Sequence, residues 1–362
     1  METGEPYLLF IDHVNDAIPV WHKLAGLLVK TSNLCSEITL PTSKERTAVC
    51  CLSSVNAETY DEWRGNKQFL ADVMRFLDNV LTDFIRRVEE GDISEMARAA
   101  YSARRERSVG LGLMGFHSYL QRKEIPFESQ QARDLNVELF GFIDDAATIA
   151  SRLLAEEKGP CPDAAEYGYM ERFSNKTALA PTASISIICG GASPCVEPIA
   201  ANAYTHKTLS GSFLVKNRYL ERLLETKGLN TDKVWSDIIT TDGSVQHLDF
   251  LTDEEKAVFK TAYELDQNWV VQHAADRAGF IDQAASNNLF FPPDVDKAVL
   301  LEAHYKAWKL GVKSLYYCRS RSLKKAHAVS EKVERIRIIE DVIAPMEADN
   351  DEDDYFVCEA CQ

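Results

Sequence analysis

The fold of this chain is organised around residues 32–42, which read Ser32-Asn33-Leu34-Cys35-Ser36-Glu37-Ile38-Thr39-Leu40-Pro41-Thr42. In an extended segment side chains alternate between two faces, which would put Asn33, Cys35 and Glu37 on one face. That face carries an amide, a thiol and a carboxylate, groups that could orient a polyol such as ribose, react with it and take its proton. A short amphipathic strand with one buried cysteine is the simpler interpretation, so the rest of the chain has to decide.

The composition is that of an acidic globular protein. With 362 residues, 45% of them hydrophobic, the chain has the size of one large α/β domain or two average ones. The net charge of −16 argues against nucleic-acid binding through a basic surface. The sequence shows neither a long apolar run nor a signal peptide, so we expect a cytoplasmic protein without a membrane span. Nine cysteines then predict reduced thiols rather than a disulfide framework.

Alternating strand and helix patterns predict an α/β fold with a parallel sheet and helical crossovers. We expect strands at 6–12, 47–53, 208–215, 288–291 and 312–321, and helices at 69–88, 128–158, 217–226, 231–239, 253–280 and 294–310. The last helix should begin after a cap at Asp294. Its buried stripe should be Val295, Ala298, Leu301, Tyr305 and Trp308.

Two small-residue motifs deserve separate interpretations. The glycines at 110, 112 and 115 have the spacing of a dinucleotide loop, but no acidic residue follows a second strand. Close packing of a strand and turn on a helix explains them more simply. Residues 181–184, Pro-Thr-Ala-Ser, end an apolar run and predict a helix N-terminus with a hydroxyl cap. The free backbone N–H groups at such a helix N-terminus could bind a phosphate, although a helix that is merely capped gives the same sequence pattern.

The C-terminal residues form an acidic tail with two thiols. Residues 347–354 are almost entirely acidic and predict a disordered tether. Cys358 and Cys361 follow it, and a mobile redox dithiol is favoured over zinc because no second Cys or His pair lies nearby in the sequence. The root-mean-square reach of such a tail is on the order of 20 Å, and its extended length is on the order of 50 Å.

Five features occur in one order along the chain. They are Asn33-Leu34-Cys35-Ser36-Glu37, Cys50, Pro181-Thr182-Ala183-Ser184, Tyr316-Tyr317 and the terminal pair Cys358 and Cys361. Together they resemble the large, catalytic subunit of class I ribonucleotide reductase, and 3–7 and 199–204 resemble it too. The resemblance implies the second half of a ten-stranded α/β barrel with a catalytic finger loop over 1–340, followed by a flexible acidic tail over 341–362.

The resemblance also implies roles for the polar residues of the finger. Cys35 would become a thiyl radical that removes a hydrogen atom from the ribose of a ribonucleoside diphosphate. Glu37 would take a hydroxyl proton, and Asn33 would orient the ribose. Cys50, rather than its neighbour Cys51, would be one of two cysteines that supply the reducing equivalents.

Further implied roles fall on the later motifs. Thr182, Ala183, Ser184 and Ile185 match the loop that holds the substrate diphosphate, with Ile185 where a hydroxyl residue is common. Tyr316 and Tyr317 match a tyrosine pair that relays the radical from the small subunit. Because adjacent residues of a regular strand face opposite sides, a stacked pair predicts a bend or a strand end there. Cys358 and Cys361 would re-reduce the site by disulfide exchange.

The expected partners follow from the same resemblance. They are a radical-generating small subunit, of a di-iron tyrosyl type, and thioredoxin or glutaredoxin as reductant, with no metal or cofactor bound directly and no nucleic acid or membrane partner. The family's large subunit is longer, and its N-terminal half carries the allosteric sites, half of the barrel and the partner of Cys50. We therefore expect a split or truncated C-terminal half that needs a separate N-terminal half and forms a higher oligomer.

Three alternatives remain at this point. A cobalamin-dependent reductase would use the same finger residues but has no need of the Tyr316-Tyr317 relay. A glycyl-radical form should carry a glycine near its C-terminus, where Gln362 follows Cys361. A non-catalytic remnant that only binds other reductase subunits would not need the cysteines and tyrosines that this chain retains.

Overall fold

The computed structural model describes residues 4–208 and 211–320. Short parallel strands lie at the centre, as the alternating pattern predicted. Strand β2 (Cys51–Asn56) pairs in parallel with β3 (Val109–Met114), with Cys51 opposite Val109 and Asn56 opposite Met114. The series continues by parallel bridges from Leu111 to Thr177 and from Leu179 to Ala285. Strands β6 (Leu289–Phe291) and β8 (Cys318–Ser320) add a further parallel pair.

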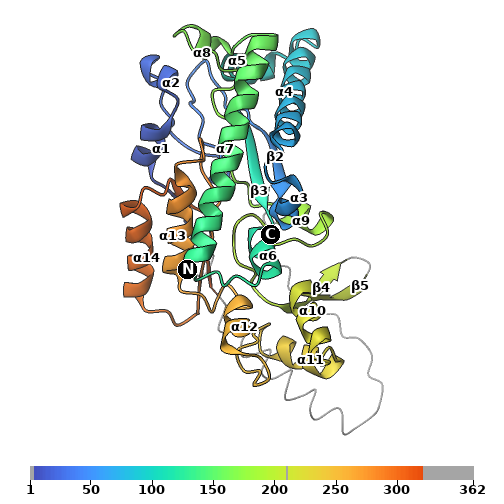
Figure 1. Ribbon diagram of the computed structural model, residues 1–362. Helices are drawn as coiled ribbons and strands as arrows, with labels where there is room; N and C mark the ends of the chain where they lie inside the picture. The colour runs from blue at the N-terminus through green and yellow to red at the C-terminus, as the bar shows by residue number, and fades with distance from the viewer. Residues whose placement is uncertain (1–3, 209–210, 321–362) are drawn as a thin grey trace.

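Helices connect these parallel segments and cover their outer side. The crossovers use α3 (Tyr60–Trp63), α4 (Lys67–Glu90), α5 (Ala97–Glu106), α6 (Phe116–Arg122), α7 (Gln130–Lys158), α8 (Pro162–Ala165), α13 (Gln267–Ala278) and α14 (Lys297–Lys309). Figure 1 shows the long helix α7 between α4 on one side and α13 on the other, with α14 outermost. Parallel segments with helical crossovers are the arrangement expected of part of an α/β barrel.

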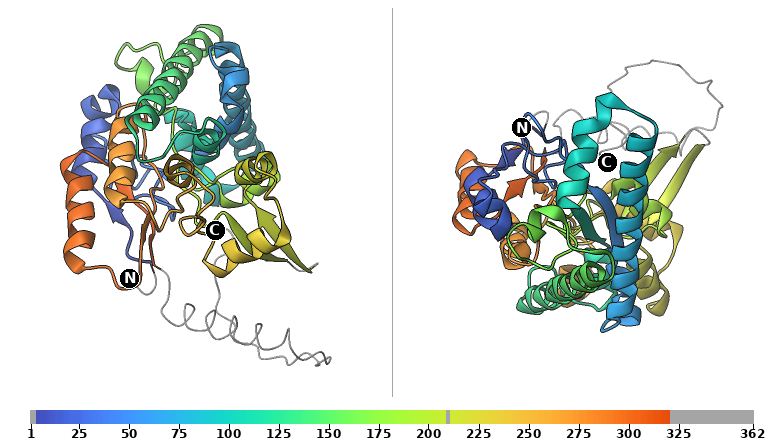
Figure 2. Two further views of the ribbon diagram at one scale, coloured as in Figure 1. Left: turned by 60° about the horizontal axis from the view of Figure 1, so that its bottom comes forward. Right: turned by 90° about the horizontal axis from the view of Figure 1, so that it is seen from above.

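A smaller lobe follows the central segment. It contains the antiparallel hairpin of β4 (Ala203–Thr208) and β5 (Gly211–Lys216), and the helices α10 (Arg218–Thr226), α11 (Asp232–Thr240) and α12 (Asp253–Val258). The lobe has its own core, with Leu220, Leu224 and Trp235 at its centre. Both views of Figure 2 show the hairpin projecting from the edge of the molecule.

The N-terminal residues lie against the end of the described chain. Strand β1 (Leu8–Leu9) pairs antiparallel with β7 (Ser314–Leu315) and leads into α1 (Ile11–Ala17) and α2 (Val20–Leu24). The remaining elements are α9 (Ala183–Ile188) and the 3-10 turns η1 (Ala57–Thr59) and η2 (Ser94–Met96).

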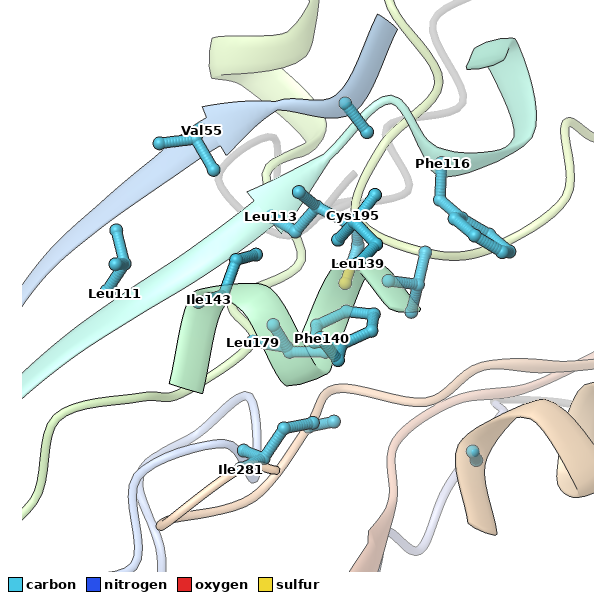
Figure 3. Packing of buried hydrophobic residues seen from close by; sticks show 14 of the residues in the cluster. Val55, Leu111, Leu113, Phe116, Leu139, Phe140, Ile143, Leu179, Cys195 and Ile281 are labelled. Carbon is cyan, nitrogen blue, oxygen red and sulfur yellow. The ribbon is translucent and has the colours of Figure 1, made fainter. Parts of the chain in front are cut away.

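The main core lies between the strands and α7. Figure 3 shows Val55, Leu111 and Leu113 of β2 and β3 facing Leu139, Phe140 and Ile143 of α7, all of them buried. Each such side chain stabilises the fold by roughly 1.5–3 kcal/mol relative to full exposure. This layer fixes the strands on which the candidate site is built.

Local sequence explains several of these elements. Asn66 and Ser129 accept hydrogen bonds from the first turns of α4 and α7, so both predicted long helices begin at a capped residue. The glycines at 110 and 112 are closely packed, as predicted, but against the neighbouring parallel segments rather than a helix. A Cβ on Gly110 would lie 2.4 Å from the Leu52 side chain, and one on Gly112 would lie 2.6 Å from a backbone oxygen of Ala178.

Other expected boundaries were wrong. The strand predicted at 6–12 is limited to Leu8–Leu9, and the one predicted at 47–53 is shifted to Cys51–Asn56. The strand predicted at 208–215 spans a hairpin. The helix predicted at 253–280 is two helices, because Asp266 accepts a hydrogen bond from the Asn268 N–H and starts a new helix there.

Helix α14 differs from its prediction in both its cap and its buried face. Asp296, not Asp294, caps it, and the fully buried positions are Ala303 and Ala307. Leu301, Tyr305 and Trp308 of the predicted stripe are 69%, 57% and 48% exposed. The predicted tail over 341–362 lies outside the described residues. No helix within the described part of the chain is long and apolar enough to cross a membrane.

Candidate active site

The finger residues form a tight turn rather than the extended strand that we predicted. The Ser36 N–H donates to the carbonyl of Asn33 at 3.2 Å, and Ser36 has a φ of 63°. A regular strand has no positive φ, so the alternation argument does not apply here. The turn nevertheless brings two of the three predicted side chains together, because the Asn33 side chain hydrogen-bonds the carboxylate of Glu37.

Glu37 is buried against the segment that precedes β6. Its carboxylate Oε2 lies 3.3 Å from the Ser286 hydroxyl, which donates to the carbonyl of Cys35 at 2.6 Å. The Glu37 carbonyl accepts from the Ala284 N–H at 3.0 Å. Burial raises the pKa of Glu37 above its ordinary value, and the hydrogen bonds from Asn33 and Ser286 oppose that rise only in part. A carboxylate with a raised pKa is a better proton acceptor once it is ionised.

Cys35 lies next to the first predicted relay tyrosine. The Tyr316 hydroxyl donates to Cys35 Sγ at 3.5 Å, within hydrogen-bond distance of a sulfur acceptor. Tyr316 is only 2% exposed, whereas Cys35 is half-buried. Although 281 residues separate them in sequence, the two residues are in direct contact.

The tyrosine pair lies at a break between two strands, as a stacked pair requires. Strand β7 ends at Leu315 and β8 begins at Cys318, which confirms the predicted strand end. The ring centroids of Tyr316 and Tyr317 are 4.3 Å apart with planes at 53°. Asn288 anchors the pair, because its side-chain oxygen accepts from the Tyr317 N–H at 3.0 Å.

Cys50 precedes β2 and is held by a buried glutamine. Gln283 Nε2 donates to Cys50 Sγ at 3.4 Å and to the Val109 carbonyl at 3.2 Å. Gln283 Oε1 accepts from the Thr39 N–H at 3.1 Å, so the same side chain also holds the finger segment. Burial raises the pKa of Cys50 to about 12, and the Gln283 hydrogen bond opposes that rise. Cys51 instead packs against the main core.

The predicted phosphate-binding residues lie at the start of a short helix, and the residue before this helix has an unusual backbone conformation. Helix α9 begins at Ala183, but Thr182 does not cap it through its side chain. Thr182 has a φ of 54°, and its hydroxyl accepts from the Cys195 N–H at 2.7 Å instead. The predicted cap was therefore wrong. Ser184 and Ile185 are exposed, and backbone N–H groups of a first helical turn have no intrahelical acceptor.

The predicted phosphate-binding residues 181–185 and the finger turn lie at the same edge of the strand series. The segment before residue 181 ends near Leu179, whose carbonyl accepts from the Ser286 N–H at 2.9 Å. Ser286 in turn contacts Glu37 and the Cys35 carbonyl. Cys358 and Cys361 lie outside the described residues. Within residues 4–208 and 211–320, no group of three His, Cys, Asp or Glu residues could hold a metal ion.

Sequence reasoning missed three residues that contact this site. Ser286 begins the polar run 286–288, and Gln283 lies three residues before it, separated by two alanines. That polarity was the available signal. The apolar run at 6–12 predicts that Tyr7 is part of a core strand, yet its ring lies 4.7 Å from Tyr316 and 5.0 Å from Tyr317. Only the pairing of β1 with β7 reveals that contact.

Known proteins of similar sequence include viral reductase subunits. The large subunit of ribonucleoside-diphosphate reductase from Invertebrate iridescent virus 6 is 50% identical over 301 residues, which cover 82% of this chain and 31% of the relative. The large subunit from Invertebrate iridescent virus 3 is 47% identical over 325 residues, covering 89% of this chain and 51% of the relative. The chain thus spans about half the length of such relatives, or less.

A solved structure and a family description agree with these relatives. The class Id ribonucleotide reductase alpha subunit of Actinobacillus ureae superposes with a TM-score of 0.83 at 41% identity, covering 91% of this chain and 60% of that one. The family described as ribonucleotide reductase, barrel domain, matches residues 1–171 and 163–318. The predicted barrel fold is thereby confirmed, and the chain belongs to the ribonucleotide reductase family.

Proposed function

We propose that this chain carries the catalytic finger of a ribonucleoside-diphosphate reductase large subunit, which makes deoxyribonucleotides by a thiyl-radical mechanism. The observation that carries the proposal is the 3.5 Å contact between the Tyr316 hydroxyl and Cys35 Sγ. An electron and a proton can leave a thiol together, as a hydrogen atom, when the acceptor oxygen lies in direct contact with it. Tyr316, as a phenoxyl radical, would take the Cys35 hydrogen atom and leave a sulfur radical.

The surrounding residues fit the remaining steps. The Cys35 sulfur radical would remove a hydrogen atom from the substrate ribose. Glu37, with its raised pKa, would accept a ribose hydroxyl proton, and Asn33 would orient that hydroxyl. Cys50 would supply one of the two reducing thiols, and Cys358 and Cys361 would restore it by disulfide exchange.

Substrate and partners belong to the same proposal. Residues Thr182, Ala183, Ser184 and Ile185 would hold the diphosphate through backbone N–H groups, because Thr182 uses its hydroxyl on Cys195. The radical would come from a small subunit through Tyr317 and Tyr316, and thioredoxin or glutaredoxin would reduce the tail. The rest of the barrel would come from large-subunit residues beyond this sequence, in the same or a separate polypeptide. A cytoplasmic location remains a prediction.

The test is turnover by the assembled enzyme, in which this chain is combined with the rest of the large subunit and with the small subunit. Cys35→Ser should abolish nucleoside diphosphate reduction, while Cys189→Ser, at an exposed cysteine, should leave it at the wild-type rate. Nucleotide binding should persist in both variants. Unchanged turnover in the Cys35→Ser enzyme would remove the proposed radical role of Cys35 altogether.

A further inference from the structure

The side chain of Asn288 connects the relay to a second carboxylate. Its oxygen Oδ1 accepts from the Tyr317 N–H at 3.0 Å, and its Nδ2 donates to Glu197 Oε2. The Leu289 N–H donates to the Tyr317 carbonyl at 2.9 Å, so two consecutive residues hold both polar backbone groups of Tyr317. Asn288 is only 2% exposed and directly precedes β6. The backbone position of Tyr317 therefore depends on which way the Asn288 amide faces.

Glu197 determines the direction of that amide. A backbone N–H can only donate, so the Asn288 side chain holds Tyr317 only when it presents its oxygen. The flipped amide has nearly the same shape, but it would place an NH₂ donor against the Tyr317 N–H. An ionised carboxylate can only accept, so the Asn288 amide lies between a donor and an acceptor. Only one of its two orientations satisfies both of these neighbours.

A cavity beside this pair makes the hydrogen bonds more important than packing. Glu197 lines a cavity of about 530 Å³, together with Phe290 and Arg319. A side chain next to such a space has no packing partners on that side, so hydrogen bonds must fix its position. Removal of the Glu197 carboxyl would take away the acceptor of Asn288 Nδ2, and a buried donor without an acceptor is unfavourable.

Arg319 connects the same carboxylate to the ring of Tyr317. Its guanidinium carbon lies 5.2 Å from the centroid of that ring, within the range of a cation–π contact. Burial raises the pKa of Glu197 to about 7, and the charge of Arg319 and the bond from Asn288 oppose that rise. Glu197 and its two partners therefore contact Tyr317 at both its backbone and its ring, through Asn288 and Arg319 respectively.

We propose that Glu197 is a positioning residue of the radical relay, which acts through Asn288 to hold Tyr317 in place. Tyr317 stacks on Tyr316 at 4.3 Å, and the Tyr316 hydroxyl contacts Cys35 Sγ. Transfer between groups in contact depends on their placement, and a displacement of about 1 Å can lower a rate on the order of a hundredfold. The inference rests on the proposed function above, because a relay is needed only if Cys35 becomes a radical.

The experiment measures nucleoside diphosphate reduction by the assembled enzyme with substitutions at Glu197. Glu197→Leu removes the acceptor and should lower kcat by roughly ten- to a hundredfold, with KM for the nucleotide unchanged. Glu197→Gln keeps an oxygen that can accept from Asn288, so it should restore most of the lost rate. Glu197→Asp keeps the charge but withdraws the carboxyl oxygens from Asn288, so it should show the loss of Glu197→Leu in smaller measure.

A second measurement reports on the Tyr317 ring directly. Aminotyrosine at position 317 is oxidised more easily than tyrosine, so it would trap the radical there. The electron paramagnetic resonance spectrum of the trapped radical depends on the angle of the ring about its Cβ atom. We expect this spectrum to change in Glu197→Leu and in Glu197→Asp, and to keep its wild-type form in Glu197→Gln. A loss of stability without a displacement of Tyr317 would leave the spectrum unchanged.

The matched control is Glu171→Leu. Glu171 is a buried carboxylate that accepts from Arg152 of α7 at 2.8 Å, so this variant should keep the wild-type kcat and spectrum. A wild-type kcat in Glu197→Leu, or in Glu197→Asp if the leucine variant does not fold, would overturn the proposal. An equal loss in Glu197→Gln would also overturn it, because the charge rather than the hydrogen bond would then matter. If Cys35→Ser keeps its turnover, the proposed function fails. If Cys35→Ser is inactive and Glu197→Leu is normal, the positioning role alone fails.

Discussion

The finger turn and helix α14 were both marked by clear sequence patterns, and each pattern misled in a different way. At Asn33–Glu37 the predicted backbone was wrong, yet Asn33 and Glu37 still meet and Cys35 contacts Tyr316. At α14 the predicted helix was right, yet the large apolar residues of its stripe are exposed. Polar groups are held by partners from distant elements, whereas an apolar stripe reveals an amphipathic helix but not which neighbour covers it.

The largest expected effect is at Glu37, the buried carboxylate of the finger turn. Glu37→Gln should lower turnover by roughly 10²–10⁴-fold, the usual range for a lost acid–base group. The acid limb of the activity profile of the unmutated enzyme should lie above the ordinary range of a glutamate, because the pKa of Glu37 is raised. Steady-state kinetics over a pH series measure both.

The same substitution should not weaken the fold. A raised pKa means that folding disfavours ionised Glu37, and glutamine resembles the protonated form. Thermal unfolding should therefore give an equal or higher midpoint for Glu37→Gln. A lower midpoint would show that the lost turnover reflects lost structure.

A substitution in an outer helix can also have a large effect on stability where that helix buries a charged side chain. Asp78 of α4 is fully buried, and its carboxylate contacts Arg107, Arg172 and Lys158. Asp78→Asn should reduce the free energy of unfolding by about 3–5 kcal/mol, because it leaves buried cations without a counter-charge. Asp72→Asn on the same helix, at an exposed position, should change it by no more than about 0.5 kcal/mol in denaturant titrations.

The contribution of Asp78 should also depend on pH. Burial alone would raise its pKa, but Arg172 and Arg107 outweigh burial and hold the pKa below the ordinary value. The stability that Asp78 provides is thus complete above the unfolded-state pKa of about 3.9 and is lost as the pH falls through the lower folded value. Asp78→Asn should therefore be least harmful in strong acid, which denaturant titrations at several pH values would measure.

A smaller effect is expected at Gln283. An N–H donated to a charged group is worth roughly 1.5–3 kcal/mol, so Gln283→Leu should raise the pKa of Cys50 further. Alkylation of Cys50 at a fixed pH, followed by mass spectrometry, should slow about tenfold for each pKa unit. Gln267→Leu removes a buried amide that bonds only backbone groups, Ala262 and Leu265 among them, and should leave the rate unchanged.

The smallest effect is expected on the exposed face of α14. Leu301→Ser should change the free energy of unfolding by no more than about 0.5 kcal/mol, since Leu301 is 69% exposed. Ala307→Leu, on the buried face of the same helix, should cost about 1–3 kcal/mol through overpacking. A larger loss of stability in Leu301→Ser than in Ala307→Leu would instead support the buried stripe predicted from the sequence.

Sequence periodicity predicted what local physics controls. The long helices α4 and α7 follow from their apolar spacing and their caps at Asn66 and Ser129, and the strand break at Tyr316-Tyr317 follows from the geometry of adjacent side chains. The finger turn could not be predicted, because its positive φ at Ser36 is stabilised by contacts with residues far along the chain. Tyr7, Gln283 and Ser286 join the site only through strand pairing and tertiary hydrogen bonds.

The six residues from Gln283 to Asn288 contact three separate groups of the site. Gln283 contacts Cys50, Ser286 contacts Glu37, and Asn288 holds Tyr317. Three chemical tasks therefore depend on one short spacing along one backbone. A deletion or insertion of a single residue within this segment would change the distances along the backbone between these side chains and displace them relative to Cys50, Glu37 and Tyr317. Point substitutions there damage one task at a time, but a change of length would damage all three.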